Sequence, residues 1–219
     1  MKALMYKEWK LAMSPVPLLF LTLSALLLIP SYPYYVTFFY TSLGIFLFFQ
    51  SCRENRDVYY MMLLPVTKSE MVRARVKTVL LLELLQAVCC VPFMLVRAQY
   101  GHIQNEVGIE ANAAFLGLAL VQMGVFNALF LPMHYKTGYD LGKPFLLCSI
   151  VQFLLIALLE TGEHVLLAVF PQSAALLESY ALSDQLRQLP ILLGGACIWL
   201  LLSLLAERRS VKRFEKVDL

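Results

Sequence analysis

The sequence predicts an all-α integral membrane protein with six transmembrane helices, and three observations lead to this prediction. Of the 219 residues, 60% are apolar and 15% are charged, and the mean hydropathy is +0.70. Soluble domains stay nearer roughly 45–50% apolar and about 25% charged. The apolar excess is spread over six long runs, and the charges gather between them. The pattern excludes a soluble enzyme, a disordered scaffold and a secreted disulfide framework, and it predicts a single membrane domain over residues 1–219.

Each apolar run approaches the length of about 20 residues that a helix needs to cross a bilayer. The predicted spans are 11–30, 34–51, 78–96, 113–133, 144–159 and 190–206. Only Ser31, Tyr32 and Pro33 join the first two spans, so these must form a tight helical hairpin. The fifth run is short, and we expect it to borrow a turn from its flanks.

The distribution of lysine and arginine predicts the topology. If the connections alternate between the two sides of the membrane, 16 of the 18 lysines and arginines fall on one side together with both termini. Cytoplasmic flanks are enriched in these residues. We therefore expect both termini, and the charged connection 52–77, to lie in the cytoplasm.

The N-terminal 13 residues have a weak amphipathic pattern. Met5 and Trp9 fall on one helical face and Lys7 and Lys10 on the opposite one, while Glu8 lies beside the apolar face. This pattern predicts a helix that lies in the membrane interface. The alternative is a simple polar extension whose lysines snorkel to the headgroups.

The connection between the fifth and sixth spans, residues 160–189, contains an apolar stretch from His164 to Phe170. This stretch is too short to cross a bilayer but apolar enough to enter the interface. We expect a re-entrant or surface-lying helix on the outer side, with a solvated loop as the alternative.

Motifs of catalysis are absent from the sequence. It contains no GxSxG, no HExxH and no GxxxxGK[ST] phosphate-binding loop, so the chain cannot hold a nucleotide by the P-loop mechanism. The histidines lie near predicted span ends, where they are more typical of interfaces than of metal sites: His102, His134 and His164. The cysteines form no CxxC pair and are expected to be free thiols: Cys52, Cys89, Cys90, Cys148 and Cys197. We expect no catalytic residue, no metal and no cofactor on this chain.

A few polar residues interrupt the spans and are candidates for lining a translocation path. They are Glu83, Gln86, Gln122, Asn127 and Gln152. A carboxylate within a span is costly, so Glu83 should face protein or water rather than lipid. It belongs either to a translocation path or proton-linked step, or to the cytoplasmic end of its span, paired with Lys77 or the headgroups. Gln86 lies on the same helical face and could share a partner helix with Glu83.

The connection 52–77 carries the most informative local signals. Pro65 stops any preceding helix, and Thr67 and Glu70 have the spacing of a capping box that starts a helix leading into the third span. The apolar block 58–64 before the proline is costly to expose in water. Either lipid headgroups cover it as an interfacial helix, or a partner protein covers it as a docking helix.

Three stretches resemble a known family. The run from Asp57 to Arg75, the run from Leu131 to Lys143 and the motif Tyr6–Trp9 are similar to segments of the permease subunits of bacterial type-2 ABC exporters. Within that family, the chain most resembles small six-span permeases of exporters for phenol-soluble-modulin-like peptides. Lys68 departs from the pattern, because the family often has an arginine at this position, and a lysine preserves the charge but not the bidentate fork.

The resemblance implies two contacts with a separate ATPase. The loop after the second span would be the coupling helix, and its candidate contact residues are Glu54, Asp57, Tyr60, Met61, Leu64, Pro65, Thr67, Glu70 and Arg73. The loop after the fourth span would make a smaller contact through Tyr135, Gly138, Asp140 and Lys143, with Gly138 allowing a tight turn. The resemblance also implies short re-entrant helices in segment 160–189, with Pro171 as a break.

The resemblance further implies a permease that exports an amphipathic or hydrophobic substrate, such as a peptide, a lipid-like molecule or a drug. Its partners would be two copies of an ATPase that holds ATP and Mg²⁺, a second copy or close paralogue of the permease, and membrane lipid, but no nucleic acid. The location would be the bacterial plasma membrane. The alternatives are a membrane assembly or binding protein without transport, and an ion-coupled carrier that uses Glu83.

Overall fold

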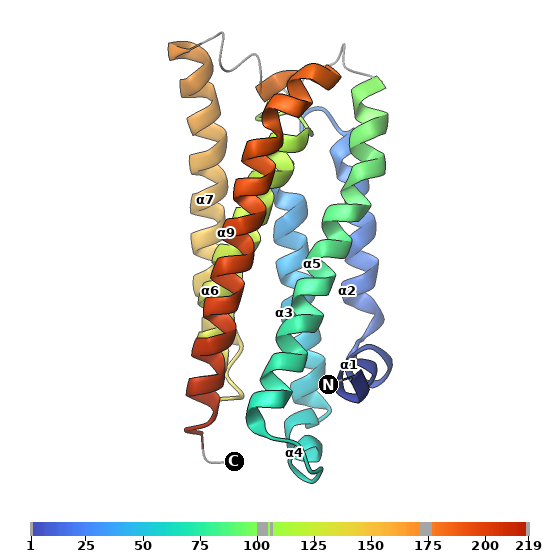
Figure 1. The fold of residues 1–219 in the computed structure, drawn as a ribbon, viewed down its shortest axis with the longest axis vertical. Helices are drawn as coiled ribbons and strands as arrows, with labels where there is room; N and C mark the ends of the chain where they lie inside the picture. The colour runs from blue at the N-terminus through green and yellow to red at the C-terminus, as the bar shows by residue number, and fades with distance from the viewer. Residues whose placement is uncertain (1, 100–104, 106, 171–176, 218–219) are drawn as a thin grey trace.

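The computed structural model describes residues 2–99, 105, 107–170 and 177–217, and within this part every regular element is a helix (Figure 1). The elements in chain order are α1 (Lys2–Lys7), η1 (Glu8–Ala12), α2 (Pro15–Phe20), η2 (Leu21–Leu28), α3 (Tyr35–Glu54), α4 (Asp57–Met62), α5 (Lys68–Gln99), α6 (Ala113–His134), α7 (Gly142–Val169) and α9 (Leu182–Phe214). The predicted all-α class is confirmed.

Five helices in the described residues are long and apolar enough to cross a membrane: α3, α5, α6, α7 and α9. The N-terminal segment supplies a sixth if Lys2–Ala12 and Pro15–Leu28 are counted together, but these two parts meet at a bend of 85°. The predicted first span therefore begins at Pro15 and not at residue 11. The 14 residues of α2 and η2 together rise about 25 Å, because a 3₁₀ helix rises about 2.0 Å per residue.

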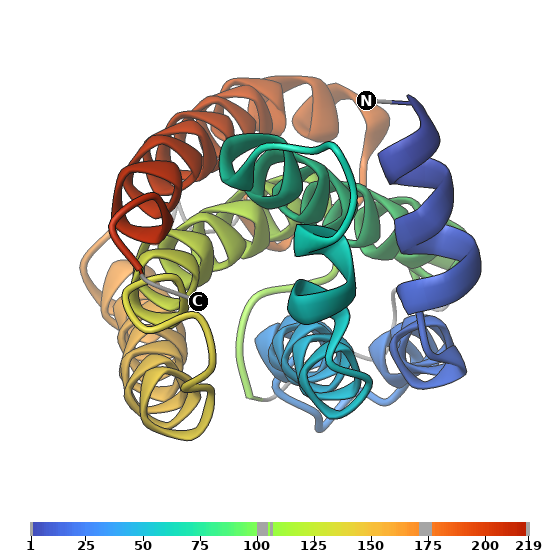
Figure 2. The same cartoon turned by 90° about the horizontal axis from the view of Figure 1, so that it is seen from below.

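The N-terminal helix turns away from the bundle axis. In the view from below, α1 and η1 lie across the picture while α3 beside them is seen nearly end-on (Figure 2). Ser14 has an extended backbone and Pro15 starts the next helix, where a missing N–H costs no hydrogen bond. A helix in this orientation agrees with the predicted amphipathic element, and its place in the membrane interface stays a prediction.

Close backbone contact joins α6 to α9. A Cβ atom on Gly195 would lie 2.0 Å from the Gly117 carbonyl oxygen, and one on Gly124 would lie 2.9 Å from the Cα of Trp199. Small residues allow this approach, which is the usual means of helix association in membranes. Both helices also contribute side chains to the polar cluster described below.

The last two spans are longer than the sequence predicts. Helix α7 continues past the predicted end at 159, and the stretch 164–169 forms its final turns rather than a separate helix. Helix α9 extends the predicted span 190–206 in both directions. Pro171 and His102 lie outside the described residues, and a re-entrant segment stays a prediction.

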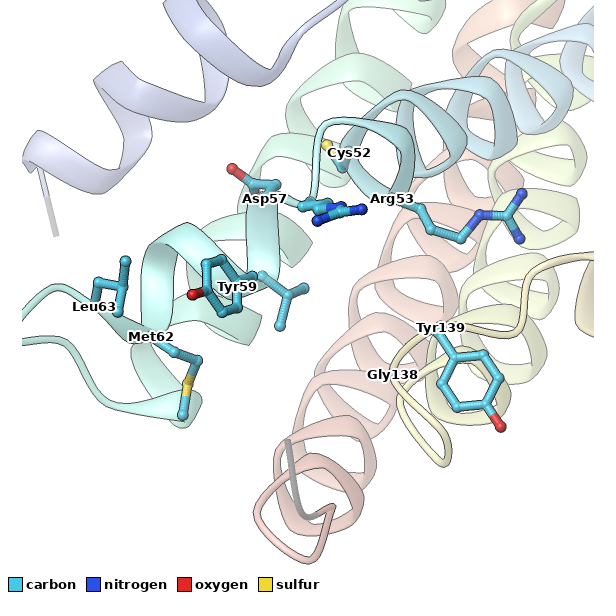
Figure 3. Close-up of a pocket in the computed structure, with 10 residues that line it drawn as sticks. Cys52, Arg53, Asp57, Tyr59, Met62, Leu63, Gly138 and Tyr139 are labelled. Atoms are coloured by element: carbon cyan, nitrogen blue, oxygen red, sulfur yellow. The ribbon is translucent and has the colours of Figure 1, made fainter.

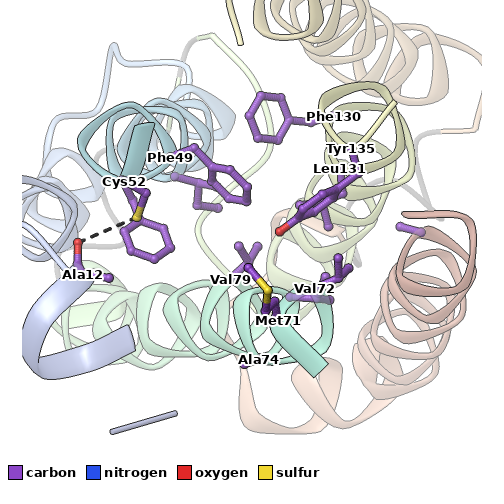
Figure 4. Close-up of a cluster of buried hydrophobic side chains, with 14 of the residues drawn as sticks. Ala12, Phe49, Cys52, Met71, Val72, Ala74, Val79, Phe130, Leu131 and Tyr135 are labelled. Atoms are coloured by element: carbon purple, nitrogen blue, oxygen red, sulfur yellow. Dashed lines mark hydrogen bonds between the residues drawn. The ribbon is translucent and has the colours of Figure 1, made fainter. Parts of the chain in front are cut away.

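One end of the bundle carries α1, α4, the start of α5, the loop after α6 and the end of α9 (Figure 1). We call it the charged end, since most of the lysines and arginines lie there. Its core is a cluster of buried side chains from the N-terminal segment, α3, α5, α6 and α9, and the Cys52 Sγ lies 4.0 Å from the Ala12 carbonyl oxygen there (Figure 4). All five cysteines are free thiols, as predicted.

Candidate docking surface at the charged end

A short helix crosses the charged end between α3 and α5. The chain leaves α3 through Arg56, whose φ of 52° lies in the left-handed region, and then forms α4. Viewed from below, α4 lies between the lower ends of its two neighbours (Figure 2). A bend of this kind places α4 outside the row of spans, at the surface of the bundle.

The predicted capping box starts α5. The Glu70 N–H donates to Thr67 Oγ1 at 3.3 Å, and the Thr67 N–H donates to Glu70 Oε2 at 2.9 Å. These reciprocal bonds satisfy two backbone donors that a helix start otherwise leaves open. Helix α5 runs from Lys68 to Gln99, so the 57–67 segment leads directly into the helix of the third span.

Helix α4 and the residues after it present an apolar surface. The exposed side chains are Tyr59, Tyr60, Met62, Leu63 and Leu64, which we call the α4 surface. Exposed apolar side chains gathered in this way mark an interaction site with protein or membrane. Met61, which the sequence predicts as part of the packing surface toward the ATPase, is buried against the core in this chain.

Ion pairs hold α4 against the bundle. Arg75 Nε donates to Glu8 Oε2 at 2.5 Å, and the same guanidinium donates to Asp57. Lys7 Nζ lies 2.5 Å from Asp57 Oδ1. The Arg75 guanidinium also lies 5.0 Å from the ring centre of Phe48. We call Lys7, Glu8, Asp57 and Arg75 the ionic cluster; it connects α1, η1, α4 and α5.

The ionic cluster corrects the prediction for Asp57. Its carboxylate was expected in an aqueous loop, but it is paired with two cations and largely covered by protein. Sequence reasoning missed the partners because Glu8 and Arg75 are 67 positions apart. The signal was Glu8 beside the apolar face of the N-terminal helix, where a carboxylate must be paired once it is buried.

A pocket of about 390 Å³ opens beside α4. Tyr59, Met62 and Leu63 lie on one side of it, Gly138 and Tyr139 lie on the loop after α6, and Arg53 comes from the end of α3 (Figure 3). The structure thus brings together the two loops that the sequence predicts as contacts. The pocket combines an apolar wall with an exposed cation, a surface suited to a protein partner.

The second loop makes a tight turn. Gly138 has a φ of 78° and donates its N–H to the His134 carbonyl at 2.9 Å, so the predicted turn is confirmed. Tyr135 is buried against Phe49 and Phe214, and burial raises the pKa of its phenol above the ordinary value. Tyr135 is therefore a buried member of the predicted contact segment. Tyr139, which lies in the same segment, is exposed.

The other predicted loop residues are distributed over the charged end. Leu64, Pro65, Thr67 and Lys143 are exposed, as is Glu54, which accepts a hydrogen bond from Gln50 at 2.9 Å. Asp140 is partly covered, and its carbonyl oxygen lies 3.0 Å from His134 Nδ1. Arg73 lies toward α9 instead, with its Nε 3.6 Å from Glu207 Oε1.

Glu83 forms a buried polar cluster between three helices. Its Oε2 accepts hydrogen bonds from Trp199 Nε1 at 2.7 Å and from Asn127 Nδ2 at 2.9 Å, and Asn127 also donates to Ser203 at 3.0 Å. All four side chains are buried. The expected pairing of Glu83 with Lys77 or the headgroups is wrong, because α6 and α9 supply its partners.

The remaining polar residues of the spans also bond within the chain. Gln86 donates to Ser24, Gln122 to the Tyr35 carbonyl and Gln152 to Ser42. Gln86 therefore contacts η2, not the helices that hold Glu83. All three are buried in this chain, where they join helices to each other.

This fold is that of a polytopic helical membrane protein, and its charged end presents an exposed apolar surface on a short helix. A family model described as ABC-2 family transporter protein matches residues 3–207. The chain belongs to this family of ABC transporter permeases. Neither the comparison with curated proteins nor that with solved structures gives a match.

Proposed function

We propose that this chain is the membrane subunit of an ATP-driven exporter, and that the α4 surface and Tyr139 dock a separate ATPase. The observation that carries the proposal is the α4 surface itself: an apolar, exposed surface on a helix that the ionic cluster holds rigidly. Tyr59 and Tyr60 are 63% and 61% exposed, although large apolar side chains in water favour a covering partner. ABC-2 permeases generally work with an ATPase subunit, which makes such a partner the natural one.

Force would then pass from α4 to α5. Closure of two ATPase copies around ATP and Mg²⁺ would move α4, and the capping box and Arg75 link α4 to the start of α5. The full transporter would hold two ATPases and two permeases, the second being another copy or a close paralogue. Its location would be the bacterial plasma membrane, with the charged end in the cytoplasm.

The substrate class follows from the interior of the chain. The polar side chains of the spans are buried within the chain and each makes a hydrogen bond there, so a path between two such permeases would be lined mostly by apolar side chains. Such a path suits an amphipathic peptide, a lipid-like molecule or a hydrophobic drug. The resemblance to permeases of phenol-soluble-modulin exporters favours the peptide.

The test is purification of the tagged protein in mild detergent from its host, followed by identification of co-purifying chains and an ATP hydrolysis assay. A P-loop ATPase whose turnover depends on this chain is the expected result. The variant Y59A/Y60A should weaken its retention at least about 10-fold, because exposed aromatic side chains are typical binding hot spots. Tyr6→Ala is the matched control, since Tyr6 is 66% exposed at the same end but outside the α4 surface.

Two outcomes would contradict the proposal. A preparation without any ATPase, under conditions that keep other ABC transporters intact, would favour an assembly protein or a carrier. Equal loss of the ATPase in Y59A/Y60A and in Tyr6→Ala would show that the α4 surface is not the docking site.

A further inference from the structure

An apolar groove follows one face of α9. Its lining residues recur at intervals of three and four, so they form one stripe along the helix: Cys197, Leu200, Leu201, Leu204, Leu205 and Arg208. The groove has a volume of about 420 Å³ and is apolar except at Arg208. A groove of this kind accepts a hydrocarbon chain, and Arg208 marks the end at which a polar group would lie.

The same stripe continues into a charged pocket toward the charged end. This pocket of about 290 Å³ is lined by Arg73, Glu207, Arg208, Val211, Lys212 and Glu215. Arg208 lines both cavities, so the groove and the pocket are neighbours along α9. The apolar groove is therefore next to a pocket that contains three cations and two carboxylates, Glu207 and Glu215.

Two of these cations are available to a ligand. Glu207 is engaged by Arg73 at 3.6 Å. Among the residues that the structure describes, neither Arg208 nor Lys212 lies within ion-pair distance of a carboxylate, and both side chains are exposed. Guanidinium and ammonium groups are strong donors to phosphate oxygens.

We propose that the groove and the pocket together bind one anionic phospholipid. An acyl chain lies along Leu200, Leu201, Leu204 and Leu205, and Arg208 and Lys212 bind the phosphate. Basic pockets where membrane helices reach the headgroup level are typical sites for anionic lipids. Along α9 the apolar groove comes first and the two unpaired cations follow. This order matches a lipid molecule, whose acyl chain would lie in the groove and whose phosphate would lie at the cations.

Native mass spectrometry of the detergent-purified protein tests the proposal with three ligands at equal concentration. These are palmitoyl-oleoyl phosphatidylglycerol, the phosphatidylcholine with the same chains, and glycerol 3-phosphate. The protein should retain the phosphatidylglycerol most strongly. In R208Q/K212Q this preference should fall about 10-fold or more, because two cations near the headgroup are removed.

R209Q/K216Q is the matched control, because Arg209 lies on α9 and Lys216 lies just after its end, and both are exposed and outside the two cavities. R209Q/K216Q loses the same charge as R208Q/K212Q and should keep the preference for phosphatidylglycerol. R208K/K212R keeps both cations and should keep that preference too. Equal loss in the control would overturn the proposal by showing general attraction to a basic tail. Glycerol 3-phosphate binding as well as the lipid would overturn it too, since the groove would then contribute nothing.

A second copy of the chain is the competing occupant of the groove. Cys197 lies exposed in it and reports on this alternative. Oxidation of native membranes should leave the protein monomeric by electrophoresis. A dimer that forms in the wild type and disappears in Cys197→Ser would overturn the proposal, because a protein surface would then cover the groove.

Discussion

Arg75 on α5 donates from Nε to the Glu8 carboxylate at 2.5 Å, and this bond fastens the N-terminal helix to the helix that forms the third span. The same guanidinium reaches Asp57 on α4 and lies over the Phe48 ring. One buried cation therefore determines the positions of three elements at the charged end. Because the network is buried, removing one of its members leaves an uncompensated charge that water cannot solvate, and this destabilises the fold.

Arg75→Ala should destabilise the protein by about 3–5 kcal/mol, because it leaves the Glu8 and Asp57 carboxylates without their shared cation. Lys77→Ala is the control on the same helix: Lys77 is exposed, and its loss should change stability by less than about 0.5 kcal/mol. Unfolding in detergent, followed by circular dichroism, gives the comparison. Equal stability of the two variants would show that the network contributes nothing to the fold.

Gly195→Ala should separate α6 from α9, since the added Cβ would meet the Gly117 carbonyl at 2.0 Å. Overpacking of this kind costs about 1–3 kcal/mol. Gly194→Ala is the neighbouring control: nothing lies within 4 Å of its Cβ position, and alanine favours a helix over glycine by roughly 0.5–1 kcal/mol. Thermal unfolding should therefore shift downward in the first variant and stay or rise in the second. The reverse order would refute the close contact.

The sequence allowed prediction of the features that depend on local pattern. The five helices that are long and apolar enough to cross a membrane in the described residues follow from apolar run length, and the capping box of Thr67 and Glu70 follows from spacing alone. The first span was placed four residues early, because apolarity does not distinguish Leu11 and Ala12, which end the N-terminal helix, from the span that Pro15 begins. The boundary between the N-terminal helix and the first span depends on backbone geometry, which cannot be read from residue composition.

Contacts between distant segments were not predictable in the same way. A buried ion pair between Glu8 and Arg75, or a hydrogen bond between Glu83 and Trp199, depends on which helices are neighbours. The residue type indicates that a carboxylate in a span needs a partner, but it does not indicate which residue is that partner. For this reason the sequence does not indicate that Asp57 and Tyr135 face inward. Both lie on segments too short to show a helical hydrophobic periodicity.

Topology can be tested with two exposed positions at opposite ends. Tyr139→Cys lies at the charged end and Ser183→Cys lies near the start of α9. If the lysine and arginine distribution sets the orientation, a membrane-impermeant maleimide should label Ser183→Cys in intact cells and Tyr139→Cys only after lysis. The wild type gives the background of the five native cysteines. Labelling of Tyr139→Cys in intact cells would reverse the predicted orientation.

Glu83→Gln distinguishes a structural carboxylate from an ion-coupling one. The glutamine amide oxygen can still accept from Trp199 and Asn127, so we expect a loss of stability below about 1 kcal/mol and an unchanged dependence of transport on ATP. Glu83→Leu has no acceptor and leaves the buried Trp199 N–H unpaired, which should cost about 1–3 kcal/mol.

The chain has only two tryptophans, so a Trp9→Phe background makes fluorescence specific to Trp199. Its emission should change in Glu83→Leu and stay nearly constant in Glu83→Gln, because only leucine removes the hydrogen bond to the indole. A stable Glu83→Gln protein that has lost all activity would contradict this interpretation. The titratable carboxyl group itself would then be required, and the ion-coupled alternative would have to be preferred, because the glutamine oxygen keeps both hydrogen-bond donors of the site.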